Sequence, residues 1–300
     1  MAELIAALDI GGTKTQLIIE EVRGKRLLDV TEPSLDWEAE PAHEAAEFIA
    51  ARVSKHTPPG GKVVALAFGA QGIDRPETAH ALEAALAAKG YPATAVNDAW
   101  LLIAAGGFTQ GIGVISGTGA IAVGADANGT FVAAGGWGWV LGDDGGASAL
   151  VREATKAALY ARDDGKPDDG LLGALVRDYG VADAERLTRL VNDEPTMDNW
   201  APHAHAVFAA ADAGSALAIR VIDDGARALA DNVRQIRSRG AVGTDVVVAG
   251  SVFVNQTRLL DAFTRHVATL APRLRVHRLE KAPVEGAVFL ARNAAAARRT

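Results

Sequence analysis

The sequence contains no cysteine, few histidines and no long apolar run. Without cysteine there can be no disulfide, thiolate zinc site, cysteine nucleophile or iron–sulfur cluster in the chain. The seven histidines are scattered, and the closest pair, His203 and His205, has an i,i+2 spacing that points the two rings apart on a helix. A metal centre held by histidines is therefore not expected.

Basic charge is also scarce, because the formal net charge is −7. This balance argues against nucleic acid or an anionic membrane as a partner. No apolar run approaches the roughly 18 residues of a transmembrane helix, and the N-terminus lacks the basic and apolar regions of a signal peptide. The 300 residues, 49% of them hydrophobic, predict a cytoplasmic globular protein of about two domains.

Hydrophobic periodicity in the first third alternates between strands and helices, which predicts an α/β domain. Strands are expected over 3–10, 15–22, 26–32, 62–70 and 93–98, and helices over 38–55 and 75–90. The segment 111–126, GIGVISGTGAIAVGAD, restarts the pattern and suggests a duplicated domain plan, or a coincidence in a glycine-rich chain. Helices are expected from about 147 to 240 and from 250 to the end, around a strand over 245–250.

Three glycine turns carry the first functional signal. In DIGGTKT, Gly11 and Gly12 allow a close backbone approach to a ligand, and Thr13, Lys14 and Thr15 add hydrogen-bond donors. Asp9 before them suits a hydrated Mg²⁺, although an ordinary tight hairpin would also explain the stretch. The second turn contains Ser116, Gly117, Thr118 and Gly119, and the third is Gly250-Ser251 before a helix starting near Val252.

A catalytic candidate follows from the position of Asn97 and Asp98 at the end of a buried strand, where α/β sheets present ligand-facing groups. The Asp98 carboxylate can accept the proton of a hydroxyl group that attacks a γ-phosphate in line. The alternative is that the pair caps the helix that follows. Both interpretations can hold together.

These residues together carry a resemblance. Asp-x-Gly-Gly-Thr, Ser-Gly-Thr-Gly and the late Ala-Gly-Ser turn resemble the sugar kinase, actin and heat-shock chaperone ATPase superfamily. The segment GGWGWVLGDDGGA (135–147) and the closing APVEGAVFLA are similar to N-acetylglucosamine kinases and their BadF/BadG/BcrA/BcrD relatives. The resemblance implies two ribonuclease-H-like domains, with ATP in the cleft between them, and covers essentially the whole chain.

The resemblance implies a division at residues 1–107 and 108–284, with a helical insertion in the second domain and a C-terminal helix, about 285–300, that packs back on the first. It implies ATP and Mg²⁺ as cofactors, a small sugar as substrate, and Asp98 as the general base for transfer to the 6-hydroxyl. The superfamily is often dimeric, and the sequence identifies no interface.

Binding residues are carried over position by position. For the sugar these are Asp36, Gln71, Asn97, Asp98, Gly136, Trp137, Gly138 and Asp143, with Trp137 or Trp139 as an aromatic wall. For ATP they are Gly11, Gly12, Thr13, Lys14, Thr15, Gly117, Thr118, Gly119, Gly250, Ser251 and Asn255. Asp9 is expected to hold Mg²⁺ through water.

Departures from the family pattern leave the sugar open. Asp36 stands where the family has an asparagine, Ala120-Ile121 replace a polar pair, and GDDGGA replaces Gly-Asp-Glu-Gly-Ser. An aspartate near C2 would suit the ammonium group of glucosamine, because opposite charges attract. The leading interpretation is an N-acetylglucosamine kinase. The alternatives are a kinase for glucosamine, glucose or a muramic-type sugar, an ATPase that activates a radical enzyme, which the missing cysteines disfavour, and a sugar-sensing repressor.

Overall fold

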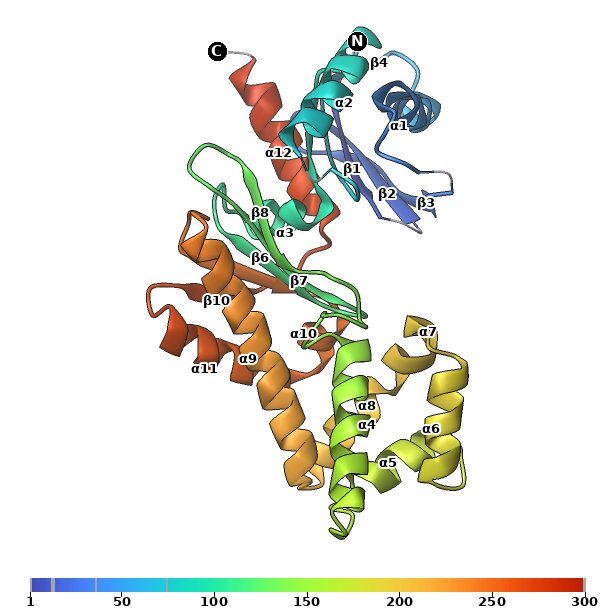
Figure 1. Cartoon of the computed structure of the whole chain (residues 1–300). Coiled ribbons are helices and arrows are strands. Elements are labelled where there is room, and N and C mark those ends of the chain that lie inside the picture. The colour runs from blue at the N-terminus through green and yellow to red at the C-terminus, as the bar shows by residue number, and fades with distance from the viewer. Residues whose placement is uncertain (1, 12–13, 36, 74, 299–300) are drawn as a thin grey trace. The chain divides into compact units, whose positions relative to one another are not determined.

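A computed structural model of the chain describes residues 2–11, 14–35, 37–73 and 75–298. Contacts divide the chain into two compact units (Figure 1). The first comprises 1–113, 124–131 and 279–300, and the second comprises 114–123 and 132–278. The first of two five-stranded sheets lies in the first unit, and most of the second sheet lies in the second unit. The helices and sheets agree with the predicted α/β class.

The first sheet has the order β3-β2-β1-β4-β5. Its strands are β1 (Ala2–Ile10), β2 (Lys14–Glu21), β3 (Arg26–Pro33), β4 (Gly61–Ala70) and β5 (Ala93–Asn97). β1 pairs antiparallel with β2 and parallel with β4, which in turn pairs parallel with β5. The carboxyl ends of β1, β4 and β5 therefore meet at one edge of this sheet, where a candidate site is expected.

Alternation along β1 explains why helices cover both faces of this sheet. Leu4, Ala6 and Leu8 join a buried cluster with α1 (Ala42–His56) and α2 (Pro76–Ala88), whereas Ile5 and Ala7 pack with α12 (Val284–Ala297). Successive side chains of a strand point to opposite faces, so a strand that is apolar throughout needs cover on both sides. In Figure 1, α12 and α1 lie on opposite sides of the sheet.

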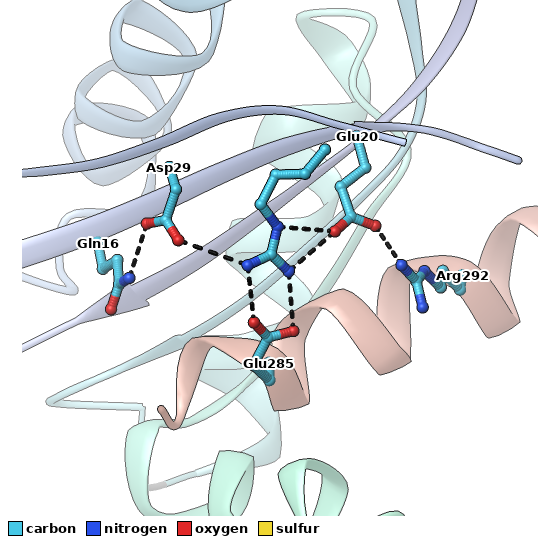
Figure 2. A network of polar contacts seen from close by, with 6 residues as sticks. Gln16, Glu20, Asp29, Glu285 and Arg292 are labelled. Carbon is cyan, nitrogen blue, oxygen red and sulfur yellow. Dashed lines mark hydrogen bonds and ion pairs between the residues drawn. The ribbon is translucent and has the colours of Figure 1, made fainter. Parts of the chain in front are cut away.

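A polar network joins α12 to β2 and β3 (Figure 2). Glu20 is only 1% exposed, and its carboxylate accepts hydrogen bonds from Arg26, at 2.9 and 3.0 Å, and from Arg292. Arg26 also pairs with Glu285, its Nη1 lying 2.8 Å from Oε1. A buried carboxylate is stable only when it is paired in this way. The network therefore ties the end of the chain to its beginning.

The second sheet has the order β10-β9-β6-β7-β8. Its strands are β6 (Ile112–Ser116), β7 (Ala120–Ala125), β8 (Phe131–Gly135), β9 (Asp245–Ala249) and β10 (Arg275–Arg278), with β9 and β10 parallel. The expectation of helices alone after residue 250 is wrong, because β10 forms there. Its sequence RVHR has no fully buried position, so hydrophobic periodicity gives no signal for it.

Helices make up most of the rest of the second unit. They are α4 (Ala147–Asp163), α5 (Leu171–Asp178), α6 (Ala184–Asp193), α7 (Met197–Trp200), the 3₁₀ helix η2 (Ala201–His203), α8 (Ala204–Asp212), α9 (Ala216–Ser238), α10 (Ser251–Asn255) and α11 (Thr257–Leu270). In the first unit, the 3₁₀ helix η1 (Asp98–Trp100) and α3 (Leu101–Ala105) follow β5. No helix within the described residues is both long and apolar enough to cross a membrane.

One local expectation about the histidines is wrong. His203 Nδ1 lies 2.6 Å from Asp178 Oδ2, and His205 Nε2 lies 2.7 Å from Asp178 Oδ1, so both rings meet one carboxylate. His203 ends η2 and His205 stands in the first turn of α8. Because the two residues lie in different helix types, the i,i+2 geometry of a single α-helix does not apply to them.

Candidate active site

The proposed base stands at the end of β5, at the start of η1. The backbone N–H of Ala99 donates to Asn97 Oδ1 at 3.0 Å and to Asp98 Oδ1 at 2.9 Å. Asn97 therefore serves as the cap of η1, as the structural alternative predicted. This cap fixes the backbone from which both side chains project.

A glycine that the sequence interpretation missed allows this segment to lie close over β4. Gly69 pairs with Asp9 on β1 and with Val96 on β5. A Cβ atom on Gly69 would lie 2.4 Å from Leu101 Cγ and 3.1 Å from the Cα of Asp98. Only glycine leaves room for the η1 segment, so Gly69 helps to position Asp98. The sequence signal that could have identified Gly69 is its place in Phe68-Gly69-Ala70, at the end of a buried strand.

Asp9 and Asp98 influence one another electrostatically. Burial and, second to it, the negative charge of Asp98 together raise the pKa of Asp9 to about 6, and the ammonium group of Lys14 acts in the opposite direction. A bound cation would relieve both unfavourable effects. The described residues contain no cluster of three or more His, Asp or Glu that could hold a metal. Mg²⁺ is commonly held by one or two carboxylates and keeps several waters, and Asp9 and Asp98 supply this kind of donor.

The structure describes the two ends of the first glycine turn, Gly11 and Lys14. Gly11 N–H donates to the carbonyl of Lys14 at 3.0 Å, and Lys14 is exposed. Gly12 and Thr13, both predicted to bind ATP, lie outside the described residues. Thr15 is 1% exposed, and its hydroxyl shares a 2.8 Å hydrogen bond with that of Ser34, so this hydroxyl is engaged inside the unit.

Gln71 lies beside the end of β1. Its N–H donates to the Ile10 carbonyl at 3.0 Å, and its carbonyl accepts from Trp37 Nε1 at 3.1 Å. Trp37 was not predicted as a site residue, and its ring also packs against Phe48. Asp36, predicted to contact the sugar, lies outside the described residues.

In the second unit, the turn after β6 is built from backbone contacts. Gly117 N–H donates to the Gly119 carbonyl at 3.0 Å, and the first N–H groups of α4 donate to the carbonyls of Gly117 and Thr118. Ser116 is fully buried and donates through Oγ to the Gly145 carbonyl at 2.7 Å. The hydroxyl of Ser116 thus supports the turn, and the exposed member of the turn is Thr118.

The third glycine segment meets this turn directly. Gly250 has φ +103°, and a Cβ atom there would lie 2.3 Å from the carbonyl oxygen of Ser116. A Cβ atom on Gly117 would lie 3.8 Å from the nitrogen and hydroxyl of Ser251. The structure therefore brings Gly117, Gly250 and Ser251 together. Asn255 stands exposed at the end of α10.

Asp143 lies where the turn after β6 contacts the segment 135–147, which contains Trp137 and Trp139. It has the left-handed φ of +55°, is 7% exposed, and its Oδ1 is buried without a hydrogen-bond partner among the described residues. A Cβ atom on Gly119 would lie 2.6 Å from Asp143 Oδ2. Burial raises the pKa of Asp143, against the lowering effect of the Gly138 and Ala120 amides. An unpaired buried carboxylate oxygen is available to a hydroxyl donor.

The tryptophans of this segment differ in their surroundings. Trp137 is 76% exposed, between Gly136 and Gly138, which have φ of +72° and +83°. Trp139 instead packs on Trp200, with ring centroids 5.2 Å apart. Of the two predicted aromatic walls, Trp137 is therefore the one whose ring is accessible.

Comparison with known proteins identifies the family. The model of the BadF/BadG/BcrA/BcrD ATPase family matches residues 8–291, so the chain belongs to that family, as the resemblance predicted. A curated relative from Clostridium acetobutylicum, named N-acetylmuramic acid/N-acetylglucosamine kinase, is 27% identical and covers 96% of this chain and 98% of its own. An N-acetyl-D-glucosamine kinase from Dictyostelium discoideum is 23% identical over 97% of this chain and 98% of its own.

Solved structures confirm the fold class. One from Chromobacterium violaceum, provisionally described as an N-acetylglucosamine kinase, has a TM-score of 0.67 at 20% identity and covers 96% of this chain and 98% of its own. A ROK family glucokinase from Streptomyces griseus, solved with glucose and AMPPNP, has a TM-score of 0.55 at 20% identity over the same shares. The two-domain sugar kinase fold is thereby confirmed. The individual site residues and the division at residue 107 stay predictions.

Proposed function

We propose that the protein is an ATP-dependent amino-sugar kinase that transfers the γ-phosphoryl group to the 6-hydroxyl of N-acetylglucosamine. The observation that carries this proposal is that Asp9 and Asp98 stand at the carboxyl ends of β1 and β5, close enough for the negative charge of Asp98 to raise the pKa of Asp9. Membership of an ATPase family supports the use of ATP, and the names of both curated relatives support an N-acetylated amino sugar as the acceptor.

In the proposed mechanism, Asp98 accepts the proton of the sugar hydroxyl as its oxygen attacks the γ-phosphorus. The new O–P bond forms while the bond from the γ-phosphorus to the bridging oxygen breaks, and the products are ADP and the sugar phosphate. The Ala99 N–H bond to Asp98 Oδ1 orients the carboxylate for this role. Mg²⁺, held by Asp9 through water, would neutralise charge on the phosphates.

The other residues bind rather than react. We propose that Gly11 and Lys14 in the first unit, and Gly117, Thr118, Gly250 and Ser251 in the second, bind ATP. Asp143 and Trp137 would bind the sugar, because Asp143 has an unpaired acceptor oxygen and Trp137 an accessible ring. We keep the division at residues 107 and 108 as part of this proposal.

The test is a coupled assay of ADP release with N-acetylglucosamine, glucosamine, glucose and no sugar. We expect the highest kcat/KM with N-acetylglucosamine and little ADP release without sugar. Asp98→Ala should abolish the sugar-dependent rate. Equal ADP release with and without sugar, or full activity of Asp98→Ala, would contradict the proposal.

A further inference from the structure

A polar hollow next to Gln71 is not used by the mechanism above. It lies within the first unit and has a volume of about 470 Å³. Its lining includes Trp37, Glu38, Glu40, Gln71, Arg75 and Thr78. Carboxylates, an amide, a guanidinium group and an aromatic ring are side chains that bind polar small molecules.

This hollow adjoins the proposed acceptor site. Gln71 donates its N–H to the carbonyl of Ile10, the residue that follows Asp9. The Nε1 of Trp37 donates to the Gln71 carbonyl and so holds this wall of the hollow in place. A sugar with its reacting hydroxyl at Asp98 could therefore extend a substituent past Gln71.

The hollow is larger than an acetyl group requires. The four heavy atoms of an acetamido group occupy roughly 120 Å³, if each takes about the 30 Å³ of a water molecule. The volume of about 470 Å³ leaves most of the space for something else. The hollow therefore has room for a substituent larger than an acetyl group.

Arg75 is the positive charge of this lining. It is exposed, and its guanidinium has no ion pair or side-chain hydrogen bond with the described residues. Arg75 also borders two adjoining hollows of about 270 and 340 Å³. Of the two acidic residues, Glu40 accepts a hydrogen bond from the Thr78 hydroxyl at 2.9 Å, and Glu38 is exposed.

We propose that the hollow binds a carboxylate-bearing substituent of the amino-sugar acceptor, and that Arg75 recognises this carboxylate. Arginine presents a planar fork of N–H donors that pairs with a carboxylate through two hydrogen bonds. The inference rests on the proposed function. It is consistent with the Clostridium acetobutylicum relative, whose name includes N-acetylmuramic acid, a sugar that bears a lactyl carboxylate.

Glu38 and Glu40 make it possible to test the effect of charge in this hollow in both directions. Their charges oppose an anion, but both are exposed, so solvent and salt screen that repulsion more than they weaken a direct contact with Arg75. Removing Arg75 and removing the charge of Glu38 should therefore change the use of an anionic acceptor in opposite directions. Neither change should affect a neutral acceptor.

The experiment measures kcat/KM on N-acetylmuramic acid and on N-acetylglucosamine for the wild type and for Arg75→Ala, Arg75→Lys and Glu38→Gln. Arg75→Ala should lower the value for N-acetylmuramic acid by about tenfold or more and leave that for N-acetylglucosamine within about twofold. Arg75→Lys should lie between, because it keeps the charge and loses the fork. Glu38→Gln should raise the value for N-acetylmuramic acid only. Arg23→Ala, another exposed arginine of this unit, is the control.

The outcomes separate the two proposals. If the wild type phosphorylates no sugar, the proposed function fails. If N-acetylglucosamine is phosphorylated but N-acetylmuramic acid is not, or if Arg75→Ala lowers both values equally or neither, the inference about Arg75 fails while the kinase activity stands. The unchanged rate on N-acetylglucosamine also shows that the variant is folded.

Discussion

The two units contribute different kinds of residue to the proposed active site. In the first, the proposed site is built from charged side chains, because Asp98 and Lys14 act on Asp9 through their charges. In the second, the turn after β6 and the segment at Gly250 depend on small residues that let backbones approach closely. The first region should therefore be sensitive to changes of charge at constant size. The second should be sensitive to added volume at constant charge.

The largest effect should come from Asp98→Asn, which removes charge and leaves size unchanged. General-base catalysis contributes about 10²–10⁴-fold, so kcat should fall by that range while the KM for ATP changes little. Steady-state and single-turnover rates measure this. Asp183→Asn is the matched control, because Asp183 also accepts a backbone N–H at a helix start, at 2.8 Å from Arg186. Equal losses in both variants would remove the special role of Asp98.

Gly250→Ala tests the other side of the comparison. The added methyl would lie 2.3 Å from the Ser116 carbonyl oxygen, so the turn must shift and the KM for ATP should rise about tenfold to a hundredfold. Gly214→Ala is the control. Gly214 has a similar φ of +98° but open space around its Cβ position. Its replacement by alanine should lower the free energy of unfolding by only about 1 kcal/mol. If the two variants bind ATP alike, the close contact is not what matters.

Asp9→Asn should stabilise the protein in the absence of Mg²⁺, in a pH-dependent way. The pKa of Asp9 is raised from 3.8 to about 6 in the folded state, so folding takes up a proton between those values and the wild type loses stability as the pH rises through them. Above pH 6 the variant should be more stable by roughly 1–3 kcal/mol, with no difference near pH 3. Urea unfolding at several pH values, with chelator present, measures this. A constant difference at every pH would contradict it.

The same variant should lose much of its response to Mg²⁺. A carboxylate that holds the ion through water contributes charge that an amide lacks, so the Mg²⁺ concentration for half-maximal rate should rise about tenfold. Titration of activity with Mg²⁺ provides the measurement. An unchanged Mg²⁺ response would place the ion elsewhere.

The smallest effect concerns the charge network of Figure 2. Arg26→Ala removes one partner of the buried Glu20 and leaves Arg292, so the free energy of unfolding should fall by about 1–2 kcal/mol. Arg162→Ala breaks an exposed pair with Glu185, which solvent screens, and should lower the free energy of unfolding clearly less. Equal losses would mean that burial of Glu20 adds nothing to this contact.

Much of the fold could be predicted because β1 to β5 and the first two helices carry clear periodicity. The sequence predicted a strand over 93–98, and β5 ends at Asn97. β10 was missed because none of its four residues is fully buried. Long-range register cannot be read from a local pattern, and for that reason the closeness of Gly69 to Asp98, of Gly250 to Ser116, and of Trp37 to Gln71 emerged only from the structure.

Family membership left one question that no variant answers alone, namely whether the acceptor of the phosphoryl group is a sugar or water. The direct measurement is ³¹P NMR of a reaction that contains the wild-type protein, ATP, Mg²⁺ and N-acetylglucosamine. We expect a phosphomonoester signal coupled to the C6 protons of the sugar, in amounts that match the ADP formed. ADP and inorganic phosphate without a sugar phosphate would contradict it.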